Sequence, residues 1–370
     1  MHRPLRATAA GVMPRDDCAA LVQAVQRNCD IADAHYAADM PLCTYLLQMR
    51  EFYRWQRGLA LGSVLPRAEV GDWIASREAH WDSLQAQAFG ALPLPGGARA
   101  EPFDAEAVNA CLLPRGLLYG GGLVGAGRPV FFLAELHHEG RREGLAVLQG
   151  GREQARSLLA PPAALAGGGH GPVIVRRESL ARWGWERWEA FSQRPHEGSA
   201  FHAMAQAYGF AAGFAQALPR WLHDQVELAV LHEVAEYRVG QRLGPPWEQL
   251  LLGLHSRRAN GLARAVRDHL ADLGHTLPQL LDSGADASLH SWFAAFDGHR
   301  QALYPSLPAA YTAWRGGDGA RALRGACARG MAHFEALAQQ VLALHGSLGD
   351  AAAVAIEQCL AAPAAVCASV

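Results

Sequence analysis

Residues 117–148 read LLYGGGLVGAGRPVFFLAELHHEGRREGLAVL, and this stretch interrupts a chain that otherwise has a helical pattern. Short apolar runs alternate here with glycine, which is typical of β-strands joined by tight turns. The dipeptide Glu139-Gly140 lies between two of these runs and predicts a hairpin turn. Together with the apolar run at residues 173–175, the stretch predicts a small antiparallel sheet of about three or four strands.

Helical periodicity dominates on both sides of this sheet. The predicted fold class is therefore mainly α (α+β), a helical bundle with a small inserted antiparallel β-sheet. Its parts are an N-terminal helical segment at residues 1–100, a small antiparallel β region at 101–177 and a C-terminal helical bundle at 178–370. We expect the C-terminal bundle to pack with the N-terminal helices.

The composition excludes several classes of function. The chain has 370 residues, of which 50% are hydrophobic and 18% charged, and its formal net charge is −2. This balance lacks the basic footprint of a nucleic-acid-binding protein, so we expect no nucleic-acid partner. All 33 basic residues are arginine, because the sequence contains no lysine. Schiff-base chemistry and a P-loop or kinase-type lysine are therefore excluded.

The sequence predicts a cytoplasmic protein with no membrane partner. The first twenty residues lack the apolar core of a signal peptide, and no apolar run reaches the roughly 18 residues of a membrane span. The 7 cysteines form no C-x-x-C pair, which favours reduced thiols over a disulfide framework. The sequence leaves open whether the protein forms a homo-oligomer, and it does not identify a small-molecule substrate.

The strongest chemical signal is the segment LHEVAE at residues 231–236, inside a long amphipathic helical pattern. At about 100° per residue, His232, Glu233 and Glu236 fall on one helix face. Helical bundles hold iron, manganese or zinc with carboxylate and imidazole ligands at this spacing. The alternative is a solvated face on which the two glutamates pair with neighbouring arginines.

A metal ion in a helical bundle takes ligands from more than one helix. The best candidates outside the segment are Glu51, Asp268 and His290, and Tyr237 or Arg238 is expected to support the ligands from behind. Each has another explanation: an arginine pair for Glu51, a charged helix end for Asp268 and a core histidine for His290.

Of two other motifs, a zincin site is disfavoured and a dinucleotide-binding fingerprint is rejected. A zincin peptidase needs a histidine at the last position of H-E-x-x-H, where this chain has Glu236. The glycines at residues 120–125 fit G-x-G-x-x-G by letter, but a strand pattern follows where dinucleotide binding requires a helix. A glycine-rich hairpin is the better interpretation, and no nucleotide cofactor is expected.

These residues predict a metal-binding helical protein, a non-haem iron or manganese oxidoreductase, with a divalent ion (Fe or Mn before Zn) as cofactor. One alternative is a non-enzymatic helical scaffold or regulatory module. A further alternative is a metal-dependent hydrolase with Glu233 as general base.

Two segments carry a resemblance to a known family. Residues 28–30 with 45–55, which read NCD and YLLQMREFYRW, and residues 231–236 resemble a family of uncharacterised bacterial proteins of similar length. The resemblance implies a bacterial cytoplasmic protein, and it assigns no catalytic residues.

Overall fold

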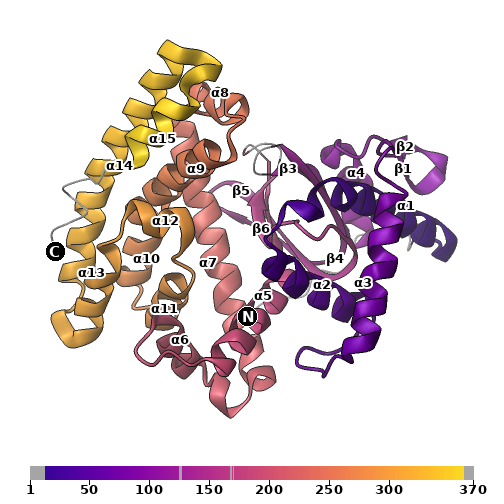
Figure 1. The fold of residues 1–370 in the computed structure, drawn as a ribbon, viewed down its shortest axis with the longest axis horizontal. Coiled ribbons are helices and arrows are strands. Elements are labelled where there is room, and N and C mark those ends of the chain that lie inside the picture. The colour runs from indigo at the N-terminus through magenta and orange to yellow at the C-terminus, as the bar shows by residue number, and fades with distance from the viewer. Residues whose placement is uncertain (1–12, 125–126, 167–168, 170, 362–370) are drawn as a thin grey trace. The chain divides into compact units, whose positions relative to one another are not determined.

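The computed structural model describes residues 13–124, 127–166, 169 and 171–361. The chain divides into two compact units. Unit 1 comprises residues 1–124 and 128–190, and unit 2 comprises residues 125–127 and 191–370. The described residues of unit 1 form helices and strands, and those of unit 2 form helices (Figure 1).

A five-stranded sheet with the order β3-β4-β5-β7-β6 forms the centre of unit 1. Its strands are β3 (Leu117–Val124), β4 (Arg128–Arg142), β5 (Leu145–Arg156), β6 (Ala163–Leu165) and β7 (Val173–Arg176). Neighbouring strands are antiparallel except β5 and β7, which are parallel. The prediction of a small, wholly antiparallel sheet is wrong in size and in this pairing. It missed β6 because alanine-rich segments have low β-propensity.

The turn between β4 and β5 lies four residues beyond the predicted position. Strand β4 continues through Glu139 and Gly140, which pair with Leu148 and Val147 of β5. The chain reverses instead at Glu143-Gly144, where both residues have positive φ, 51° and 87°. A two-residue hairpin of type I′ requires positive φ at both central positions. The segment contains two Glu-Gly dipeptides, and the strand pairing selects the second one as the turn.

The glycine-rich segment belongs to the antiparallel pair of β3 and β4, as the hairpin interpretation predicts, but its first three glycines lie within β3 and not in a turn. Gly120 and Gly121 lie in β3 opposite Phe132 and Phe131 of β4. A Cβ atom on Gly120 would lie 2.0 Å from the Phe132 ring, so only glycine allows the ring to cover the strand. The next described element after β3 is strand β4 and not a helix, which removes the dinucleotide-binding interpretation. Gly125, the last glycine of the motif, lies outside the described residues.

Unit 1 also contains helices. They are α1 (Arg15–Tyr36), α2 (Leu42–Gln56), α3 (Arg67–Asp82), α4 (Ala105–Leu112) and α5 (Arg177–Gln193), with a short two-stranded sheet of β1 (Leu92–Pro93) and β2 (Arg99–Ala100). Leu21 and Val25 of α1 pack in one core cluster with Phe131 and Leu133 of β4. The N-terminal helices thus share a core with the sheet, and their packing with the C-terminal bundle stays a prediction.

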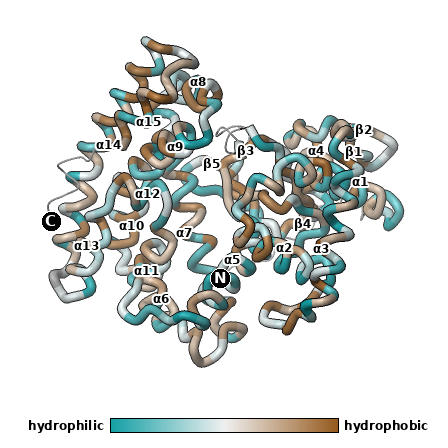
Figure 2. The backbone as a smooth tube through the Cα atoms, in the orientation of Figure 1, coloured by the Kyte–Doolittle hydropathy of each residue, from teal (hydrophilic) through white to brown (hydrophobic). Residues whose placement is uncertain are grey.

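The described residues of unit 2 are mainly helical. The helices are α6 (Ala200–Tyr208), α7 (Phe214–Leu243), α8 (Pro245–Gly253), α9 (Arg257–Ala271), α10 (Leu277–Asp282), α11 (Asp286–Ala294), α12 (Gly298–Leu303), α13 (Leu307–Ala313), α14 (Arg321–Leu348) and α15 (Ala353–Ala361). Helix α9 is central, because it contacts α7, α12, α14 and α15. Apolar and polar residues alternate along most of these helices (Figure 2), as expected where one face is buried.

A π-helical turn, Asp272–Thr276, joins α9 to α10. The sequence predicts a helix end here, because Gly274 and Pro278 follow closely; the turn instead carries the chain onward into α10. A Cβ atom on Gly274 would lie 3.0 Å from the sulfur of Met331 in α14, so the glycine lets the turn approach that helix. Single π-turns of this kind occur frequently at functional sites.

Two properties bear on the expected environment. Among the described residues, no helix combines the length and the apolar character that a membrane crossing needs. Cysteines 18, 29, 43, 111, 327 and 359 are free thiols, and Cys367 lies outside the described residues.

Candidate metal centre

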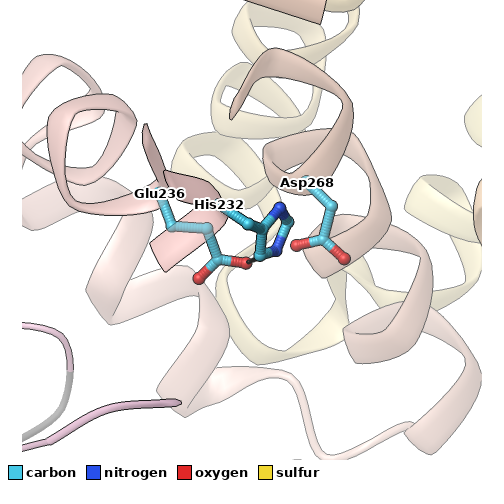
Figure 3. A group of neighbouring side chains, drawn as sticks. All are labelled: His232, Glu236 and Asp268. Atoms are coloured by element: carbon cyan, nitrogen blue, oxygen red, sulfur yellow. Dashed lines mark ion pairs between the residues drawn. The ribbon is translucent and has the colours of Figure 1, made fainter. Parts of the chain in front are cut away.

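Helices α7 and α9 of unit 2 bring three metal-ligand side chains together. His232 and Glu236 lie one turn apart on α7, and Asp268 lies on α9. One ligand atom from each residue lies within 4.8 Å of the other two. Figure 3 shows the Glu236 and Asp268 carboxylates at the same edge of the His232 ring. Among the residues that the structure describes, no other group of three histidine, cysteine or acidic side chains meets this criterion.

The imidazole of His232 is held from its other edge by Asp272. The Nδ1 atom of His232 lies 2.7 Å from Oδ1 of Asp272, whose side chain has no exposed area. A carboxylate can only accept a hydrogen bond, so Nδ1 carries the proton and donates it. Arg300 lies on the far side of Asp272, with Nη1 3.3 Å from Oδ2. In the neutral ring, the lone pair on Nε2 therefore points towards Glu236 and Asp268.

Glu236 divides its two oxygens between two partners. Oε1 lies 3.3 Å from Nε2 of His232, and Oε2 lies 2.6 Å from Nη2 of Arg267. The same nitrogen of Arg267 lies 3.8 Å from Oδ1 of Asp268. Arg267 thus fixes the orientation of the Glu236 carboxylate and leaves Oε1 directed at the imidazole.

The charges of these groups shift their pKa values in opposite directions. Burial lowers the pKa of His232, but the charges and hydrogen bonds of Asp272 and Glu236 outweigh it and hold the pKa well above its usual value. Burial raises the pKa of Glu236, but Arg267 and His232 outweigh it and lower the pKa. Burial, followed by the adjacent Glu236, raises the pKa of Asp268 well above its usual value. Without a metal, this pattern favours a protonated His232 between the carboxylates of Asp272 and Glu236.

The site is partly open to solvent. The side chains of His232 and Asp268 are 23% and 24% exposed, whereas Glu236 is 10% exposed. A metal ion held by these three side chains would keep coordination positions for water or another small ligand.

The remaining sequence candidates lie elsewhere. Glu51 is buried in α2 of unit 1, where it pairs with Arg54. The Nδ1 atom of His290 lies 2.8 Å from the Tyr311 hydroxyl, in an aromatic cluster. Glu233 is buried on α7 but lies outside the group of three ligands. The structure thus assembles His232, Glu236 and Asp268 and does not bring Glu51, Glu233 or His290 into that group.

The supporting residues also differ from those expected. Arg238 contacts the ring of His275 with an Nη1–Nδ1 distance of 2.9 Å, and Tyr237 is partly buried. The groups that hold the ligands are Asp272 and Arg267, neither of which was expected in this role. One signal for Asp272 exists in the sequence, because Asp268 and Asp272 repeat the one-turn spacing of His232 and Glu236.

Comparison with known proteins yields a family without an assigned function. The model of the N-terminal domain of a family of unknown function, DUF6866, matches residues 20–176, and the model of its C-terminal domain matches residues 181–363. No curated protein and no solved structure gives a significant match. The matched ranges follow the division between unit 1 and unit 2 closely, and His232, Glu236 and Asp268 all fall in the second. Because the two models together span most of its length, the chain belongs to the DUF6866 family.

Proposed function

We propose that unit 2 binds one divalent metal ion through Nε2 of His232 and the carboxylates of Glu236 and Asp268. The observation that carries this proposal is the convergence of three ligand atoms from two helices within 4.8 Å. One imidazole with two carboxylates suits iron or manganese, and zinc less well.

The contacts behind the ligands support the proposal. Metal-bound histidines commonly donate their second ring N–H to a carboxylate, which orients the ring and raises its basicity. Asp272 stands in that position at 2.7 Å from Nδ1. Arg267 orients the second ligand in the same manner through Oε2 of Glu236. Two of the three ligands therefore have a charged partner that directs them at the centre of the site.

A redox-active ion at this place would give unit 2 an oxidoreductase activity. Iron or manganese supplies one-electron chemistry, and an open coordination position admits oxygen or a substrate. The chain's own contribution is to fix the imidazole, to orient Glu236 and to keep one side of the site accessible.

The competing function is a non-enzymatic scaffold or regulatory module in which the same side chains form an internal ion network. The observation in its favour is that His232 and Glu236 already have partners of opposite charge in Asp272 and Arg267. Such a network would need no metal for stability.

Elemental analysis of the purified, untagged protein separates the two functions. We expect iron or manganese close to one ion per chain, and we expect His232→Ala to lose it. His223→Ala is the matched control, because His223 lies exposed on the same helix α7 and should retain the metal. A protein without metal, or a metal content that survives in both His232→Ala and Glu236→Ala, would overturn the proposal in favour of the scaffold.

A further inference from the structure

Arg267 has donor capacity that the Glu236 ion pair does not use. Both of its ion pairs, with Glu236 and with Asp268, are made by the single nitrogen Nη2. Nε is buried and has no hydrogen-bond partner among the residues that the structure describes. Leaving a buried donor without a partner destabilises the folded chain, so such a group calls for an explanation. The side chain as a whole is 18% exposed.

The net charge around the site indicates the charge of the ligand that would complete it. Within the described part of the chain, three carboxylates, of Glu236, Asp268 and Asp272, pair with two guanidiniums, of Arg267 and Arg300. A neutral His232 ligand adds no charge, so a divalent ion leaves one positive charge in excess. Glu233 and Arg264 lie close enough to interact with Arg267, and their charges cancel. The metal-loaded site would therefore attract an anion.

The positions of the groups narrow the class of anion. An open coordination position and a guanidinium next to it can hold two oxygens of the same group. The planar guanidinium matches carboxylates and phosphates, to which it donates two parallel hydrogen bonds. A ligand of this kind would bridge the ion and Arg267 at the exposed side of the site.

We propose that the substrate or co-ligand of this site is a small molecule carrying a carboxylate or a phosphate, which Arg267 recognises while the metal ion binds another of its oxygens. This inference rests on the proposed metal function and names the chemical class of its ligand.

The test measures Mn²⁺ binding by electron paramagnetic resonance, without an added anion, with inorganic phosphate and with acetate. The readout is the ratio of the Mn²⁺ Kd values without and with the anion, so changes in basal affinity cancel. We expect at least one anion to tighten Mn²⁺ binding by roughly fivefold or more, the lower range of coupling between linked sites. Phosphate also complexes free Mn²⁺ and lowers its signal, so every titration is referenced to a protein-free titration in the same anion. The anion with the larger ratio identifies the preferred headgroup.

Substitutions at Arg267 test the assignment to this residue. Arg267→Gln should bring the ratio to one. Arg267→Lys keeps the positive charge without the planar guanidinium and should lower the ratio. Arg258→Gln is the matched control, because Arg258 lies on the same helix α9 with a side chain that is 67% exposed, and it should leave the ratio unchanged.

Each outcome has a distinct meaning. If the wild-type protein binds no Mn²⁺ and carries no iron when purified, the proposed function falls, and this inference falls with it. If Mn²⁺ binds but neither anion tightens it, or the tightening persists in Arg267→Gln, only this inference is overturned. Loss of Mn²⁺ binding in both Arg267 variants also overturns it, because Arg267 would then be needed for the metal itself.

Discussion

Replacing Asp272 by asparagine removes one buried charge and almost no volume. Asp272 has no exposed side-chain area and pairs with His232 at 2.7 Å and with Arg300 at 3.3 Å. The substitution takes this carboxylate from both partners, and His232 keeps only its contact with Glu236. Breaking a buried ion pair by removing one partner costs about 3–5 kcal/mol, and the remaining amide oxygen can still accept one hydrogen bond. We therefore expect a loss of about 3 kcal/mol in the free energy of unfolding, near the lower limit of that range.

The same substitution at Asp282 is a matched control. Asp282 pairs with Arg324 at 2.6 Å in unit 2, but the two side chains are 65% and 47% exposed. Exposed pairs contribute about 0–1 kcal/mol because water and salt screen them. The two aspartates thus differ mainly in burial, and any difference between the variants measures its effect.

Urea unfolding at 25 °C in the presence of a chelator gives the comparison without a contribution from metal. With a slope of about 2 kcal/mol per molar urea, a loss of about 3 kcal/mol lowers the midpoint by about 1.5 M for Asp272→Asn. Asp282→Asn should lower it by less than about 0.5 M. If the units unfold separately, both shifts should appear in the same transition. Equal shifts for the two variants would refute the argument that Asp272 is a buried charge on which its neighbours depend.

Three further predictions concern the metal, a titrating carboxyl group and a turn. Saturating Mn²⁺, at about one hundred times its Kd, should add about 2.7 kcal/mol to the stability of the wild-type protein and none to that of His232→Ala, which thermal unfolding with and without a chelator can check. Burial, followed by the charge of Glu51, raises the pKa of Glu186 from 4.5 to about 7. The stability that the protonated carboxyl group contributes is therefore fully present below pH 4.5 and is lost as the pH rises through 7. Relative to Glu186→Gln, the wild type should therefore lose up to about 3 kcal/mol over this range in urea titrations, and a constant difference would contradict the shift. Gly144→Ala should cost about 1 kcal/mol in the same assay, because φ is 87° at this position, whereas Gly122→Ala, where a Cβ meets no atom within 4 Å, should cost less.

Regular secondary structure was largely predictable because it depends on local periodicity. The helical flanks and the antiparallel pair of strands around the glycine-rich segment follow from the residue pattern, and both are present in the structure. The hairpin turn was not predictable from its dipeptide, since Glu139-Gly140 and Glu143-Gly144 have the same local preference. Pairing along the whole of β4 and β5 decides between them, and that pairing joins residues distant in sequence. The size of the sheet was missed for a similar reason, because β6 is held by β7 and not by its own composition.

For the candidate site, the sequence by itself determined that His232 and Glu236 share a face of α7, since a spacing of four residues is one helical turn. It also supplied Asp268 as one of several acidic candidates of similar appearance. Only the packing of α7 against α9 decided that Asp268 reaches them, that Asp272 and Arg267 orient the ligands, and that His290 lies elsewhere. Helix packing is set by the whole buried surface of unit 2, so no short segment contains that information.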